Sequence, residues 1–290
     1  MPCYRRTVDS PQPLVSVLIT AWNAQQYIAA ALNSVLQQTY TNFEVIIVDD
    51  GSTDDTAKIV NQFKSDRIKL TSLAENRGIS AALNVGLRRC QGKYIARLDA
   101  DDLCLPNRLA HQVSILEGNP EIGVLGGSAL AITGNEKVLP SIQVGTDLNL
   151  GCRLLFGNQL KNSTVTIRHS VLRDNLIFYD ESFPNAMDYE LWCRLSQITR
   201  IANDASPVSV YRYHRSQQTS QHFERQLRLA LRVQASALAH ANDSRCCSRW
   251  TIAQARVAYL KYRLLLTRVR LSRAPVPFVE RLAWSNMDDR

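Results

Sequence analysis

Short runs of apolar, β-branched residues alternate with amphipathic stretches along the first 120 residues of the chain. The runs predict buried parallel strands over 15–20, 43–48, 68–73 and 94–98. Apolar residues three and four positions apart predict helices over 24–38, 54–64 and 79–89, and a further helix opens at Pro106. This alternation indicates an α/β fold of two or three layers, with crossover helices on a mostly parallel sheet. In such sheets ligands bind beyond the carboxyl ends of the strands.

The pattern loosens from about Ile122 onwards. Strands are predicted over 163–167 and 208–213, and a helix over 189–198. Residues 223–271 predict two helices joined near 242–245. We therefore expect an α/β domain over 14–221, made of a regular half (14–120) and a less regular half (121–221), followed by a basic helical C-terminal extension over 222–290.

The charge of the chain is unevenly distributed. The net charge is +8, and residues 222–290 carry all of it, with 13 basic and 5 acidic residues. The preceding part is neutral. A basic extension on a neutral body favours an anionic surface as partner, either a membrane or a nucleic acid. No nucleic-acid-binding module is recognisable, so nucleic acid is not expected.

Composition also bears on the compartment. No apolar run approaches the roughly 18–20 residues that span a bilayer, and the stretch from Met1 to Pro13 lacks the apolar centre of a secretory signal. A cytoplasmic protein is therefore expected. Its seven cysteines form no CxxC motif. Because Cys90, Cys152 and Cys193 lie among apolar residues, they are expected to be core side chains, without a disulfide framework or a zinc site.

Two clusters of carboxylates follow predicted strands. They are Asp49-Asp50-Gly51-Ser52 and Asp99-Ala100-Asp101-Asp102. Two carboxylates ~4 Å apart near a protein surface repel by about 4 kcal/mol, so such clusters favour a bound cation. Oxygen ligands suit Mg²⁺ or Mn²⁺, which also bridge substrate phosphates. Helix capping is the alternative, but it explains Asp54 and Asp102 better than Asp99 and Asp101.

At this point the chain resembles family 2 glycosyltransferases. The resemblance begins with VSVLITAWNAQQYIAAALNSVLQQTYTNFEVIIVDDGSTDDT and continues with ENRGISAALNVGL, KYIARLDADD, AMDYELWCRL and YRYHRSQQTS, in that order, over roughly 14–220. It implies a GT-A domain over 14–221, with a nucleotide-binding half (14–120) and an acceptor half (121–221). The implied reaction is inverting, metal-dependent transfer of a hexose or aminosugar. The donor would be a UDP- or dTDP-sugar, and the acceptor a glycan or lipid-linked oligosaccharide in cell-surface polysaccharide synthesis.

The resemblance also implies roles for particular residues. Thr20 and Asp50 would contact the base and ribose of the donor, Trp22 would flank the base, and Arg77 would lie near the nucleotide. Asp99 and Asp101 would hold Mn²⁺ or Mg²⁺, and Asp102 would assist through water or donor-sugar hydroxyls. Asp188 would be the general base, and Arg212 and His214 would face the diphosphate.

Plainer roles are open for several of these residues. Asp188 at a helix start could complement the helix dipole alone. His214 could be an ordinary hydrogen-bonded histidine, Arg77 a solvated loop charge, and Trp22 a packing residue. The segment GNQLKNSTV departs from a family pattern that often carries histidine, so the resemblance assigns no acceptor-site residue there.

Two other functions remain as alternatives. One is a binding protein that has kept the fold and lost catalysis, although the presence of Asp50, Asp99, Asp101 and Asp188 argues against it. The other is a sugar nucleotidyltransferase. That chemistry requires a glycine-rich basic loop after the first strand, whereas this chain has TAWNAQQY there.

The C-terminal extension contains a regular row of arginines. Arg249, Arg256, Arg263 and Arg270 are seven residues apart, with Lys261, Arg268 and Arg273 nearby, and Ile252, Tyr259, Leu266 and Val269 offer apolar partners on another side. This pattern over 249–273 favours peripheral binding to an anionic membrane, here the inner face of the plasma membrane. The alternative is a helix that packs on the enzyme with a solvated basic face.

Overall fold

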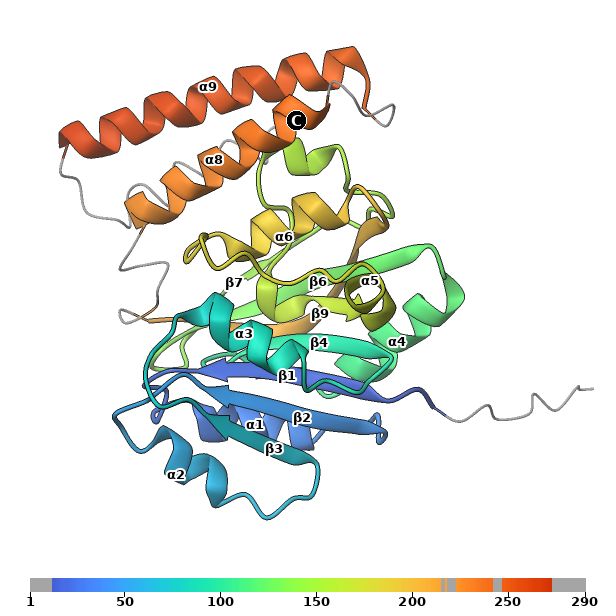
Figure 1. Cartoon of the computed structure of the whole chain (residues 1–290), viewed down its shortest axis with the longest axis vertical. Coiled ribbons are helices and arrows are strands. Elements are labelled where there is room, and N and C mark those ends of the chain that lie inside the picture. Colours follow the sequence, from blue (N-terminus) through green and yellow to red (C-terminus); the bar gives the residue numbers. More distant parts are fainter. Residues whose placement is uncertain (1–11, 215–216, 218–222, 242–246, 273–290) are drawn as a thin grey trace, which may run out of the picture.

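The computed structural model describes residues 12–214, 217, 223–241 and 247–272. In this part of the chain, nine strands form one sheet in the order β3-β2-β1-β4-β8-β6-β9-β5, with β7 paired to β6 (Figure 1). The strands are β1 (Val15–Ala21), β2 (Phe43–Asp49), β3 (Ile68–Ser72), β4 (Tyr94–Asp99), β5 (Leu103–Cys104), β6 (Ile122–Thr133), β7 (Val138–Ile142), β8 (Thr166–Arg168) and β9 (Arg200–Tyr213).

Helices and 3₁₀ turns connect these strands. They are α1 (Ile28–Leu36), α2 (Thr56–Asn61), α3 (Ile79–Leu87), α4 (Arg108–Gly118), η1 (Arg153–Phe156), η2 (Asn162–Thr164), α5 (His169–Arg173), α6 (Met187–Leu195), α8 (Phe223–Ala241) and α9 (Arg249–Ser272). The predicted parallel arrangement of the first four strands is confirmed, since β1 pairs in parallel with both β2 and β4, and β2 pairs in parallel with β3.

The sheet is the middle of three layers. Alternate residues of β1 point to opposite faces, so Val17 and Ile19 pack with α1 and α4, whereas Leu18 packs with α3 and α6. Every residue of β1 and β2 is buried. Covering both faces in this way explains why these strands are continuously apolar rather than alternating.

The second half of the sheet departs from the prediction. The segment predicted as a strand over 163–167 divides between η2 and β8. β6 was not predicted, and β9 begins at Arg200, eight residues before the predicted start. These two long strands pair in parallel from Ile122 to Thr133. Glycines in β6 and polar residues at the start of β9 hide the strand pattern. Gly126 is required there, because a Cβ atom would lie 2.2 Å from the Asn203 side chain.

The two predicted C-terminal helices are confirmed as α8 and α9. Leu229 and Val233 of α8 join the core around α6, and α9 packs beyond α8 (Figure 1). One expectation is wrong: Cys152 is bonded to Cys247 in a disulfide and is not a free core thiol. Because the partners are 95 residues apart, no local spacing indicates the pair. None of the helices in the described part of the chain is long and apolar enough to cross a bilayer.

Candidate active site

The predicted carboxylates lie along one rim of the sheet. β1 and β4 are neighbours, and their register places Thr20 opposite Asp99. Asp50 directly follows β2, and its backbone N–H donates to the Ala21 carbonyl at 2.8 Å. The carboxyl ends of three parallel strands therefore bring the nucleotide and metal candidates together, as the sequence predicts.

Asp50 holds the loop between β3 and α3. Its two carboxylate oxygens accept hydrogen bonds from the backbone N–H groups of Arg77 (2.8 Å) and Gly78 (2.9 Å). Gly51 adopts a φ of +67°, and a Cβ there would meet the Glu75 backbone at 2.4 Å. The loop is thus packed tightly against the end of β2, which leaves the Arg77 side chain exposed at the rim.

Trp22 lies just beyond the end of β1 and is 47% exposed. An indole this exposed contributes little to the core, so its position is compatible with a ligand-facing role.

Asp99 ends β4 among polar partners. Its Oδ1 accepts hydrogen bonds from Arg97 Nη2 and Asn162 Nδ2, both at 3.0 Å. The guanidinium of Arg97 is fully buried and also donates to the Leu18 carbonyl. Burial raises the pKa of Asp99, the charge of Arg97 opposes this, and the charges of Asp101 and Asp188 raise it further.

The end of β9 covers the next two aspartates. His214 Nε2 lies 2.8 Å from Asp101 Oδ2. The backbone N–H of Arg212 donates to Asp102 Oδ1 at 2.9 Å, and Arg212 Nε donates to the Asp101 carbonyl at 3.0 Å. Burial raises the pKa of Asp102 well above its usual value, and the neighbouring charges of Asp101 and Asp99 raise it further. The guanidinium of Arg212 and the imidazole of His214 thus lie directly beside the acidic cluster.

Tyr27 holds the two basic side chains of this contact. Its ring lies 4.6 Å from the His214 ring, centroid to centroid, and the Arg212 guanidinium lies 5.2 Å from the Tyr27 centroid. Gln217 adds a second brace by donating to the Arg212 carbonyl and accepting from the His214 N–H. Sequence reasoning did not identify either bracing residue.

Asp188 begins α6 in the same acidic environment. The preceding turn is set by Ala186, which adopts a left-handed φ of +89°. One oxygen of Asp188 accepts a hydrogen bond from Asn158 Nδ2 (2.9 Å), and the other accepts from the Tyr189 N–H (2.8 Å). Burial raises the pKa of Asp188, while these two hydrogen bonds and the charge of Lys161 oppose the rise. A carboxyl with this environment is suited to accepting a proton.

The oxygen atoms of the cluster fit a hard cation. Among the described residues, no three His, Cys, Asp or Glu side chains are gathered closely enough to hold a metal ion by themselves. Within the same part of the chain, however, Asp102 Oδ2 and Asn162 Oδ1 are buried and lack a hydrogen-bond partner. Mn²⁺ and Mg²⁺ take a few protein oxygens and complete their shell with phosphates and water.

Asn158 and Asn162 are the site residues most clearly missed by sequence reasoning. Both belong to GNQLKNSTV, where the usual histidine pattern of the family is absent. Each uses its side-chain amide to hold a carboxylate, Asp188 for Asn158 and Asp99 for Asn162. Two asparagines four residues apart before a buried strand were the available signal.

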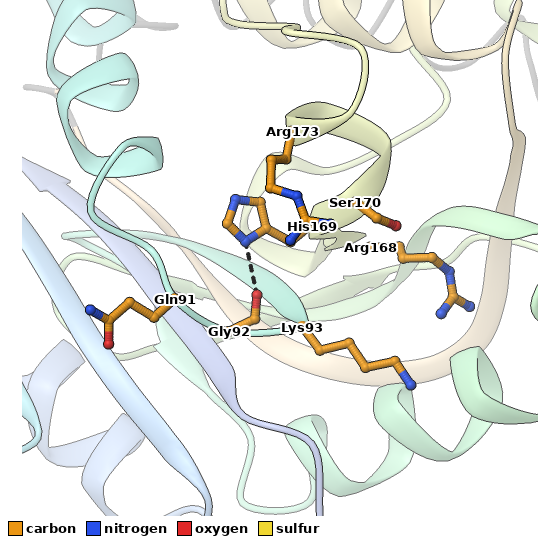
Figure 2. Close-up of a pocket in the computed structure, with 7 residues that line it drawn as sticks. All are labelled: Gln91, Gly92, Lys93, Arg168, His169, Ser170 and Arg173. Atoms are coloured by element: carbon orange, nitrogen blue, oxygen red, sulfur yellow. Dashed lines mark hydrogen bonds between the residues drawn. The ribbon is translucent and has the colours of Figure 1, made fainter.

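A cavity of about 350 Å³ lies away from this rim. It is lined by Gln91, Gly92, Lys93, Arg168, His169, Ser170 and Arg173. These residues precede β4, or end or follow its antiparallel partner β8, so they lie at the opposite end of β4 from Asp99. Figure 2 shows the imidazole of His169 bonded to the Gly92 carbonyl, at 2.9 Å. Lys93 forms an ion pair with Glu117, and Arg173 forms one with Asp174. Acidic side chains of this chain therefore already balance two of the cations that line the cavity.

Solved structures share the fold. S. aureus TarS in complex with UDP-GlcNAc superposes with a TM-score of 0.69 at 22% identity, over 86% of this chain and 72% of TarS. The mannosyltransferase PcManGT from Pyrobaculum calidifontis, in complex with GDP-Man and Mn²⁺, superposes with a TM-score of 0.59 at 20% identity, over 89% of this chain and 84% of PcManGT. Both likenesses concern the fold, and the predicted GT-A architecture is confirmed.

Sequence relatives are closer. An uncharacterized glycosyltransferase of Haemophilus influenzae is 36% identical over 72% of this chain and 68% of its own length. One from Rickettsia bellii is 34% identical over 71% of this chain, but the match spans only 30% of that longer protein. The family model described as glycosyl transferase family 2 matches residues 16–178. The chain therefore belongs to glycosyl transferase family 2.

Proposed function

We propose that this glycosyltransferase moves a sugar from a nucleotide-diphosphate donor to a hydroxyl of a glycan or lipid-linked acceptor, with inversion, in cell-surface polysaccharide synthesis. The donor is a UDP- or dTDP-sugar. The observation that carries the proposal is the placement of Asp188 at the start of α6. There Asn158 and the Tyr189 N–H hold a half-buried carboxyl whose pKa is raised by desolvation and whose charge acts on Asp99 at the sheet rim. Membership of a glycosyltransferase family decides against the nucleotidyltransferase alternative.

Asp188 is the proposed general base. The acceptor hydroxyl must lose a proton as its oxygen attacks the anomeric carbon, and a carboxylate placed on that side takes the proton. The hydrogen bonds from Asn158 and the Tyr189 N–H hold the carboxylate in one orientation. A single displacement then inverts the anomeric centre. In this role Asp188 does more than complement the dipole of α6.

The donor is assigned to the other side of the rim. Thr20, Trp22 and Asp50 flank the nucleoside, and Asp50 acts through the loop that carries Arg77. Asp99 and Asp101 would hold Mn²⁺ or Mg²⁺, and Asp102 would assist through water or donor-sugar hydroxyls. A cation bound there would supply positive charge opposite the departing diphosphate. Arg212, fixed beside Asp101, adds positive charge where the diphosphate lies, and His214 faces the diphosphate next to it.

The chain divides, in this proposal, into a catalytic domain (14–221) with halves 14–120 and 121–221, and a C-terminal extension (222–290). The extension is packed on the domain rather than tethered to it, because Leu229 and Val233 of α8 contribute to the core around α6. The α8–α9 pair is therefore available as a fixed platform on the catalytic domain.

A substitution at Asp188 tests the proposal. Asp188→Asn preserves size and removes the proton acceptor, so hydrolysis of a panel of nucleotide sugars with Mn²⁺ should fall by about 10²-fold or more. Donor binding, measured by calorimetry, should be unchanged. Asp174→Asn, at an exposed carboxylate, is the matched control and should keep full activity. Equal turnover by Asp188→Asn and the parent chain would overturn the assignment.

A further inference from the structure

Helix α9 carries a row of apolar side chains that are exposed. Trp250 is 72% exposed, Val257 54%, Leu260 55% and Leu264 65%. These four residues, the apolar row, follow one another at intervals of seven, three and four. Because an α-helix has 3.6 residues per turn, such intervals keep them on one side of the helix.

Exposed cations flank the apolar row. The arginine row consists of Arg249, Arg256 and Arg263, which follow one another at intervals of seven residues and are all exposed. Arg249, Arg256 and Arg263 directly precede Trp250, Val257 and Leu264, so the arginine row runs about 100° around the helix from the apolar row. Lys261 is exposed on the opposite flank. The outer surface of α9 is therefore an apolar strip with positive charge on both sides.

The opposite side of α9 attaches it to the enzyme. Ile252 and Ala255 are buried in a cluster with Leu155 of η1 and Leu238 of α8, and Tyr259 packs against it. The sequence placed Ile252 and Tyr259 on another side of the helix from the arginines, and in the structure that side packs on the enzyme, as in the alternative interpretation. The side chains of Arg268, Val269 and Arg270, and the whole of Arg273, lie outside the described residues.

The position of α9 leaves this surface unused by the described fold. Figure 1 shows α9 beyond α8, as the element furthest from the sheet. Since its inner side already makes the contacts that hold the hairpin, the apolar row contributes nothing to the core. Soluble proteins rarely align several exposed apolar side chains without a binding role.

We infer that α9 binds the surface of an anionic lipid bilayer, lying in the interface plane with the apolar row inserted and the arginine row among the headgroups. Charge complementarity favours a lipid surface over a second copy of this chain as the partner of α9. A second copy of the same helix would bring two sets of cations together, whereas anionic headgroups neutralise them. The inference does not depend on the catalytic assignment, because Asp188 lies on α6 and α9 is a separate element.

Vesicle sedimentation of the full chain tests the inference. The chain should pellet at least tenfold more strongly with vesicles containing about 30% phosphatidylglycerol than with pure phosphatidylcholine. Arg249→Gln/Arg256→Gln/Arg263→Gln should weaken binding to the anionic vesicles by roughly 100-fold, from about 1 kcal/mol per cation. Trp250→Ser/Val257→Ser/Leu264→Ser should abolish the binding that survives in about 1 M salt, where charge is screened.

Control variants carry changes of the same kind elsewhere on the surface. Lys58→Gln/Arg173→Gln/Arg200→Gln removes three exposed cations, and Val138→Ser/Leu176→Ser removes exposed apolar side chains. Both should bind like the parent. Every substituted residue is exposed, so thermal unfolding should show folded variants, and donor hydrolysis by them should equal that of the parent.

Three results would overturn the inference. The first is equal pelleting with anionic and neutral vesicles, or none with either. The second is unchanged binding after both α9 substitutions. The third is a parent chain that sediments as a dimer, becomes monomeric in Trp250→Ser/Val257→Ser/Leu264→Ser and does not bind vesicles, which would assign the apolar row to a second copy.

Discussion

Two opposing influences act on the pKa of the Asp188 carboxyl. Burial raises its pKa, whereas hydrogen bonds from Asn158 and the Tyr189 N–H favour the ionised form. A general base acts only when ionised, so the pKa of Asp188 sets the acid limb of the pH profile. Asn158 is the only one of these partners that a side-chain substitution removes cleanly.

Replacing Asn158 should therefore change the pH dependence. Asn158→Leu removes a hydrogen bond to the charged form, which raises the pKa of Asp188. The acid limb of kcat/KM should move to higher pH by about one unit. Profiles of kcat/KM against pH measure this. Asn175→Leu, at an exposed asparagine, is the control. A lowered plateau with an unmoved limb would show that Asn158 has only a structural role.

Tyr27 permits a second prediction at the residue scale. Its ring contacts both the His214 ring and the Arg212 guanidinium, so it helps to fix both groups beside Asp101. Tyr27→Leu loses about 1 kcal/mol of ring contacts and should raise the donor KM about fivefold with little change in kcat. Tyr27→Phe keeps the ring and should behave like the parent chain. A fall in kcat alone for Tyr27→Leu would contradict this view.

At the scale of elements, the loop between β3 and α3 depends on Gly51. Its φ of +67° and the 2.4 Å approach to Glu75 leave no room for a side chain. Gly51→Ala should lower the free energy of unfolding by on the order of 1–3 kcal/mol and weaken donor binding, because Arg77 is displaced. Denaturant unfolding and calorimetry measure the two effects.

Gly145 provides the control for that substitution. A Cβ at Gly145 would meet no atom within 4 Å, so Gly145→Ala should leave unfolding and donor binding unchanged. Full donor affinity in a destabilised Gly51→Ala chain would show that the loop does not contribute to the nucleotide site.

The elements also show what the sequence predicts and where prediction stops. β1, β2 and β4 were predicted because strands buried on both faces are continuously apolar, and the carboxylates at their ends were predicted to meet because parallel strands end at one rim. The contacts of the two asparagines were not predicted, because Asn158 and Asp188 are 30 residues apart in the sequence and Asn162 and Asp99 are 63 apart. Such contacts depend on tertiary packing and leave no periodic pattern.

For the whole molecule, the Cys152–Cys247 disulfide joins the start of α9 to the segment before η1. Closing a loop of 95 residues restricts the unfolded chain and stabilises the folded one by about 2–5 kcal/mol. In oxidised protein, Cys152→Ser should lower the free energy of unfolding by this amount. The denaturant midpoint measures it.

Reductant provides the check on that prediction. With dithiothreitol, the parent chain and Cys152→Ser should unfold at similar denaturant concentrations, because neither contains the bond. Cys193→Ser, at a cysteine that is free, should retain the response to reductant. If reductant did not change the denaturant midpoint of the parent chain, the predicted contribution of the disulfide to stability would be contradicted.

The order in which the ribosome releases the chain gives β9 a further importance. β6 leaves the ribosome about 70 residues before its parallel partner β9, and until then one long edge of β6 has no strand beside it. The aspartates at the end of β4 are likewise synthesised about 110 residues before Arg212 and His214, which contact them. A nascent chain halted before residue 200 would thus expose the unpaired edge of β6, and its Asp101 and Asp102 would lack the contacts that Arg212 and His214 supply. Synthesis of β9 is therefore the step that completes the sheet and the candidate site together.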